Sequence, residues 1–217
     1  MKTNLQLQRD VLEELEYDPS VDAAEIGVIA KDGIVTLTGK VKTYAEKSSA
    51  ARAAERVSGV KGVADEVEVQ LADIFHRTDE DIARAAVNAL EWDVMVPAER
   101  IKVMVERGYV TLEGTVDYKY QEIASVAAIR NLAGVKGITD LIKVKAVATP
   151  SGVKGRIEHA LRRAAELDAK NIKVDVNDSK VTLHGTVHSW AERSEVERAA
   201  WSAPGVTQVE DDLTVAV

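Results

Sequence analysis

The sequence predicts an α+β protein of three tandem α-β-β-α-β units, each a small mixed three-stranded sheet with two helices on one face. Three observations support this fold class. A short motif recurs at intervals of 75 and 71 residues, and inside each copy the apolar residues alternate between helical and strand periods. Hydrophobic residues at 46% and charged residues at 29% are typical of a globular chain. Aromatic residues make up only 4%, so the cores must be aliphatic.

A glycine-bounded strand motif occurs three times. It runs from Gly33 to Gly39, from Gly108 to Gly114 and from Ser179 to Gly185, with Val-Thr-Leu at its centre. A Gly-Val pair follows each copy at the same two offsets, which indicates three related units at residues 4–72, 77–148 and 152–217. We interpret the repeat glycines as structural rather than as a phosphate-binding loop, which would place them directly before a helix. These glycines are Gly33, Gly39, Gly59, Gly108, Gly114, Gly134, Gly185 and Gly205.

Each element of the first unit follows from a local pattern. Asp10–Tyr17 carries apolar residues on one helical stripe, whereas Ile26–Ala30 and Val35–Gly39 are expected strands joined by an Asp-Gly hairpin turn. Thr43–Val57 has small residues at helical spacing and precedes a Gly-Val pair, which is typical of a helix C-terminus. Glu66–Leu71 is the expected last strand of the unit.

The second and third units repeat these elements. In the third copy the connection after the first helix is four residues shorter, at the place where the second copy has Val94–Arg100. Loops tolerate such differences better than packed elements do. Asp79 is the expected N-cap of the first helix in the second unit. The remaining expected elements are the helices Asp81–Trp92, Tyr118–Leu132 and Ser189–Trp201 and the strands Leu141–Val147 and Asp212–Val217.

Charge and the absence of cysteine exclude several classes of function. The net charge is −8 and each third of the chain is net negative, which argues against nucleic acid as a partner. The lack of cysteine excludes disulfides and thiolate chemistry. The first ten residues lack the apolar core of a secretory signal, so we expect a cytoplasmic protein, or a periplasmic one if a leader peptide has been removed.

The order of these motifs resembles the BON domain family. A helix, a short strand, the Val-Thr-Leu-x-Gly strand, a second helix and a Gly-Val-x-x-Val/Ile-x-Asp segment form its pattern, here three times between Asn4 and Val217. The resemblance implies a transport-associated bacterial protein of the osmotic stress response or the cell envelope, with phospholipid as its suggested ligand and no known enzymatic chemistry. One protein with this domain binds potassium in the cytoplasm, so the resemblance also allows a monovalent cation.

The residues themselves predict no catalytic, cofactor or metal site. His184 and His188 lie four apart on an expected strand without an obvious third ligand, which favours surface histidines. Asp65, Asp140 and Asp211 recur in the repeat, and we expect them to turn the chain into the last strand. A cation site made of backbone carbonyls would leave almost no trace in a sequence.

Five aromatic residues have no equivalent in every copy, which makes them candidates for special contacts. For Tyr17, Tyr44, Trp92, Trp190 and Trp201 we favour packing in cores or between units over insertion into lipid. The sequence therefore predicts a non-enzymatic binding module of the envelope or of osmotic stress. Cation sensing and a protein-protein scaffold or chaperone-like role remain alternatives, and the oligomeric state is not set by the sequence.

Overall fold

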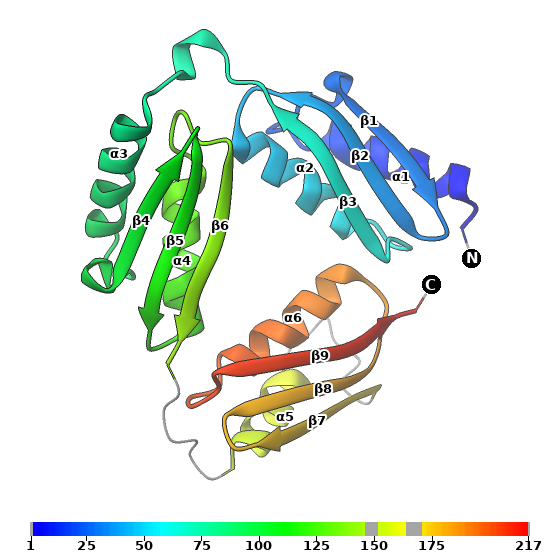
Figure 1. Ribbon diagram of the computed structural model, residues 1–217. Coiled ribbons are helices and arrows are strands. Elements are labelled where there is room, and N and C mark those ends of the chain that lie inside the picture. Colours follow the sequence, from blue (N-terminus) through cyan, green and yellow to red (C-terminus); the bar gives the residue numbers. More distant parts are fainter. Residues whose placement is uncertain (1, 146–151, 164–170, 217) are drawn as a thin grey trace.

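The computed structural model describes residues 2–145, 152–163 and 171–216 and contains three α-β-β-α-β units, which confirms the predicted fold class (Figure 1). The expected strand ends at residues 146–147 and 217, and the shortened connection at residues 164–170, lie outside the described part of the chain. The elements of the first unit are α1 (Asn4–Tyr17), β1 (Ile26–Lys31), β2 (Ile34–Val41), α2 (Tyr44–Arg56) and β3 (Gly62–Val69).

The other two units contain the same elements in the same order. The second consists of α3 (Asp79–Trp92), β4 (Ile101–Glu106), β5 (Tyr109–Val116), α4 (Lys119–Arg130) and β6 (Gly137–Val144). The third consists of α5 (Val153–Arg163), β7 (Ile172–Asn177), β8 (Lys180–Val187), α6 (Trp190–Trp201) and β9 (Gln208–Val215).

In each sheet the second strand is central. β1 pairs antiparallel to β2, and β2 pairs parallel to β3, so Val35 lies opposite both Ala30 and Val63. The hairpin turn between β1 and β2 has positive φ at Asp32 (54°) and Gly33 (87°), as a type I′ turn requires. The parallel pair needs a crossover, which α2 provides. The same pairing recurs in the other two sheets.

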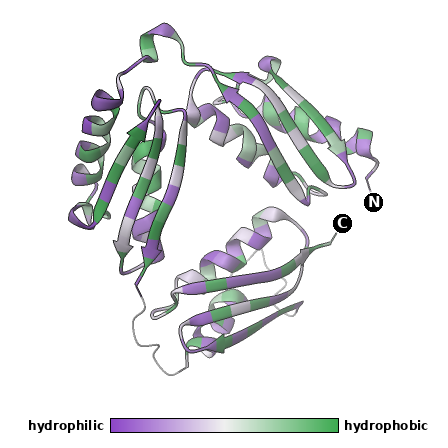
Figure 2. Ribbon diagram, in the orientation of Figure 1, coloured by the Kyte–Doolittle hydropathy of each residue, from purple (hydrophilic) through white to green (hydrophobic). Residues whose placement is uncertain are grey.

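Two helices pack side by side on each sheet and bury an aliphatic core. α1 contacts α2 and β1, while α2 contacts β2 and β3. Figure 2 shows hydrophobic and hydrophilic residues alternating along the strands, as expected when one face of a sheet is covered. The most deeply buried side chains of the first core include Val11, Leu15, Val35, Leu37 and Val60. Aliphatic packing replaces the aromatic core that the composition excludes.

Several element boundaries differ from the prediction. The last strands begin four residues earlier than expected in each unit, at Gly62, Gly137 and Gln208, because main-chain pairing with the central strand extends beyond the apolar residues. α1 begins at Asn4, where Thr3 caps it in a capping box with Gln6.

The prediction of Asp79 as an N-cap was wrong. Thr78 caps α3, accepting a hydrogen bond from the backbone N–H of Asp81. Because Thr78 fills that role, the Asp79 carboxylate is free to accept hydrogen bonds from the backbone N–H groups of Arg107 and Gly108, at 2.7 and 2.8 Å. Asp79 therefore ties the start of α3 to the β4–β5 turn.

Candidate functional site

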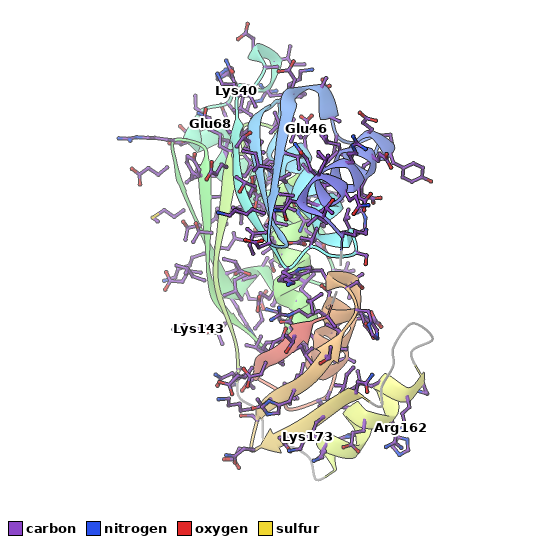
Figure 3. The ribbon with its side chains drawn as sticks, turned by 90° about the vertical axis from the view of Figure 1, so that its right-hand side faces the viewer. Lys40, Glu46, Glu68, Lys143, Arg162 and Lys173 are labelled. Atoms are coloured by element: carbon purple, nitrogen blue, oxygen red, sulfur yellow. The ribbon has the colours of Figure 1, made fainter. Side chains whose placement is uncertain are left out.

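The described residues hold no group that resembles a metal centre. No three His, Asp or Glu side chains within them are placed to share a metal ion. His184 lies 3.4 Å from Asp212 through Nδ1 and 3.8 Å from Asp175 through Nε2, so the two carboxylates flank opposite nitrogens and do not converge. The labelled charged side chains in Figure 3 are likewise spread along the molecule rather than gathered at one point. In the part of the chain that the structure describes, no helix is long and apolar enough to cross a membrane.

The recurring aspartates lie inside the last strands, which corrects the expectation that they turn the chain into them. Asp65, Asp140 and Asp211 pair opposite the central leucines of β2, β5 and β8. Each carboxylate accepts a hydrogen bond of 2.9–3.1 Å from the backbone N–H two residues later. These strands form sheet edges, where N–H groups facing outward lack a neighbouring strand. The aspartates satisfy one such group in each unit.

The side chain that lies beside the recurring aspartate is a cation in the first and third units and an acid in the second. Lys47 lies 3.5 Å from Asp65, and Arg193 lies 2.6 Å from Asp211. Glu122 occupies the equivalent position in α4, beside Asp140. Burial raises the pKa of Glu122 above its ordinary value, and the Asp140 carboxyl adds to this rise, although the ion pair with Lys119 opposes it. The second unit therefore holds two acids where its neighbours hold an ion pair.

This acid pair predicts a defined pH dependence for the Glu122→Gln variant. A carboxyl group whose pKa is raised in the folded state costs stability once the pH exceeds that folded pKa, and it costs nothing below its unfolded pKa. We expect Glu122→Gln to raise the Tm by roughly 2–4 °C at neutral pH, with the gain disappearing near pH 4. Calorimetry at both pH values measures the difference. Glu113→Gln, an exposed carboxylate of β5, is the control; equal behaviour of the two variants would contradict this interpretation.

A group of exposed apolar side chains forms one tip of the second unit, at the end of α3. Trp92 is 87% exposed, Val94 97% and Met95 50%. We call these three residues the apolar tip. The prediction that Trp92 packs in a core or between units was wrong, and so was that for Tyr17, its equivalent at the end of α1, which is 84% exposed.

The first unit provides a polar counterpart of the apolar tip. There the residues after Tyr17 are Asp18, Pro19 and Ser20, whereas the second unit has Asp93, Val94 and Met95. The backbone angles of the two aspartates agree, with φ −86° in both and ψ of 108° and 110°. Sequence reasoning located this connection through its length difference but did not identify Val94 and Met95 as a surface. Comparing its composition between copies would have done so.

The other two tryptophans lie between units, as does Tyr44, in agreement with the prediction of packing. Tyr44, Lys119 and Trp190 are the first residues of α2, α4 and α6, and each contacts a different unit. Tyr44 packs on the core of the second unit, the Lys119 ammonium lies 4.8 Å over the Trp201 ring of the third, and Trp190 packs on the core of the first. α2 and α6 contact each other where these units face one another (Figure 1). The third unit thus contacts the first unit as well as the second.

Comparison with known proteins identifies the family. The BON domain model matches residues 3–70, 78–146 and 151–217. The chain therefore belongs to the BON domain family and contains this domain three times. It is 28% identical over 130 residues to Osmotically-inducible protein Y of Escherichia coli (strain K12), a match that spans 58% of this chain and 65% of that relative.

Solved structures align to the chain with low scores. A structure of CdsD, a structural protein of the Type III secretion system of Chlamydia trachomatis, aligns with 16% identity and a TM-score of 0.26, covering 96% of this chain and 91% of CdsD. The PrgH periplasmic domain aligns with 11% identity and a TM-score of 0.22, covering 95% of this chain and all of that domain. Scores this low carry no inference about the present chain.

Proposed function

We propose that this chain is a non-enzymatic binding module that attaches to phospholipid surfaces of the cell envelope under osmotic stress. The apolar tip carries the proposal, because Trp92 at the end of α3 and Val94 and Met95 in the connection after it are all exposed. A tryptophan with adjacent aliphatic side chains suits the boundary between lipid headgroups and acyl chains. The relative named as osmotically inducible supports the connection with osmotic stress.

The charges around the apolar tip indicate a hydrophobic rather than an electrostatic mode of attachment. Glu91, Asp93 and Glu99 neighbour the tip in sequence, and the whole chain carries a net charge of −8. Anionic lipid therefore repels this surface instead of attracting it. Burying three such side chains gives weak, reversible attachment, with an apparent Kd on the order of 0.1–1 mM lipid.

Vesicle sedimentation tests the proposal directly. We expect the chain to co-sediment with phosphatidylcholine vesicles, and less with vesicles containing phosphatidylglycerol, with little dependence on salt. The double variant Val94→Pro/Met95→Ser gives the tip the residues of Pro19 and Ser20 in the first unit, whose backbone it shares. We expect this variant to bind roughly tenfold more weakly, because two aliphatic side chains that would insert into the lipid are lost.

Two control variants distinguish binding through the apolar tip from nonspecific hydrophobic binding. Ile29→Ser removes a 61% exposed aliphatic side chain from β1, away from the tip, and should leave binding unchanged. Trp92→Phe should retain binding but lose any blue shift of tryptophan emission on vesicles, since Trp190 and Trp201 already pack against protein. Absence of binding to both kinds of vesicle, or equal binding by the double variant, would contradict phospholipid attachment.

The cellular part of the proposal has its own readout. Fractionation of the source cells grown at low and high osmolarity should show the protein rising in abundance and collecting with the envelope. An unchanged amount confined to the cytosol under both conditions would argue against it.

A further inference from the structure

A cavity of about 590 Å³ lies between the second and third units, away from the apolar tip. The second unit contributes the start of α4 and the end of β6, and the third contributes the last turns of α6 and the loop after it. This volume is within the range of small-molecule sites, which are mostly apolar with a few placed polar groups. Ile123, Ala203, Pro204 and Val206 supply apolar walls of this kind.

Three aromatic residues line the cavity. The rings of Tyr118 and Tyr120 stack with centroids 5.6 Å apart and planes 13° from parallel, and both side chains are about half exposed. Trp201 lines the cavity from the third unit, with the Lys119 ammonium 4.8 Å over its ring, and its Nε1 donates to Glu197 at 3.3 Å. Tyr118 covers one face of Tyr120 and Lys119 covers one face of Trp201, so a planar aromatic molecule would stack on the remaining faces of these two rings.

Charged side chains of both signs line the cavity. Three cations, Lys119, Lys145 and Arg198, line the cavity together with two carboxylates, Asp117 and Glu197.

Most of these charges are already paired. Lys119 pairs with Glu122, Arg198 pairs with Glu195, and Asp117 lies 2.7 Å from Arg100. Glu197 accepts the indole N–H of Trp201. Among the described residues, the Lys145 ammonium has no ion-pair partner, so it is the group available to a ligand.

We propose that this cavity binds a planar aromatic molecule carrying a carboxylate, with the ring between Tyr120 and Trp201 and the carboxylate on Lys145. The site is independent of phospholipid attachment, because none of its lining residues belongs to the apolar tip. Its two walls come from different units, so the ligand also holds the second and third units together.

Calorimetric titration of the full chain with 2-naphthoate tests the site. A fragment of this size reaches a Kd of about 0.1–1 mM. Lys145→Gln should weaken naphthoate about fivefold and leave the neutral analogue 2-naphthalenemethanol unchanged. Tyr120→Ala should weaken both compounds. Lys143→Gln is the matched control, since Lys143 is an exposed lysine two residues earlier that does not line the cavity (Figure 3).

The outcomes separate the alternatives. Saturable 1:1 binding that depends on Lys145 and Tyr120 supports the site. No saturable binding up to about 5 mM naphthoate, well above the expected Kd, overturns it, and so does binding that both variants retain in full. Tighter binding of 2-naphthylmethylamine than of naphthoate would assign the site to a cation on Glu197 and also overturn the proposal. Vesicle binding by Lys145→Gln should equal that of the unaltered chain, which keeps this test separate from the phospholipid proposal.

Discussion

Replacing Gly39 by alanine is expected to lower the free energy of unfolding of the first unit by about 3 kcal/mol or more. Gly39 lies within β2 at φ +116°, opposite the start of β1, in a conformation that side chains rarely adopt. A Cβ atom there would overlap the carbonyl oxygen of Glu25 and lie 3.3 Å from the Cα of Ile26. Both obstacles are backbone, so neither can move away as a side chain would. The close approach of the two strands depends on glycine.

Gly155→Ala is the matched control for this substitution. Gly155 lies in α5, and nothing lies within 4 Å of a Cβ added there. Alanine is the better helix former, so this variant should be neutral or more stable by up to about 1 kcal/mol. Urea denaturation followed by circular dichroism, with hydrogen exchange to locate the affected unit, measures both. A Gly39→Ala protein as stable as the unaltered chain would show that the backbone around Glu25 and Ile26 moves away from the new Cβ atom without loss of stability.

Trp190→Ala is expected to detach the third unit from the first. The indole packs on the cores of both units, so truncation removes contacts on two sides and costs about 3–5 kcal/mol in total. Trp190 also lies where α6 contacts the first unit. Its loss should separate these units in solution, which X-ray scattering would record as a larger radius of gyration.

Two further variants keep this prediction specific. Trp92→Ala makes the same truncation at an 87% exposed position and should change neither stability nor radius. Trp190→Phe retains most of the ring while removing a buried N–H that has no acceptor among the described residues, so it should cost far less than alanine. An unchanged radius in Trp190→Ala would mean that the other contacts between the units suffice.

The three units use one position for three different contacts. Tyr44, Lys119 and Trp190 each begin the second helix of a unit, and each contacts another unit. The chemistry differs at every contact, since one is a tyrosine, one a cation over an indole and one a tryptophan. The units are therefore equivalent in fold and distinct in how they meet.

The sequence by itself determined the repeat, the order of the elements and the hairpin turns. These depend on residues close together in the chain: the period of apolar residues, the positive φ that Asp32 and Gly33 adopt, and the Gly-Val pair that ends a helix. The family followed from the same short patterns, because three copies of one spacing are hard to produce by chance.

Only the tertiary structure decided where the aromatic and charged residues act. Trp92 at the end of α3 and Trp190 at the start of α6 are the same residue type, yet one faces solvent and the other joins two cores. Lys145 and Trp201 meet across a cavity although 56 positions separate them in the sequence. Local sequence patterns determine the backbone of each unit. Contacts between units depend on whether the surfaces of the folded units are complementary, and these surfaces combine residues that are far apart in the sequence.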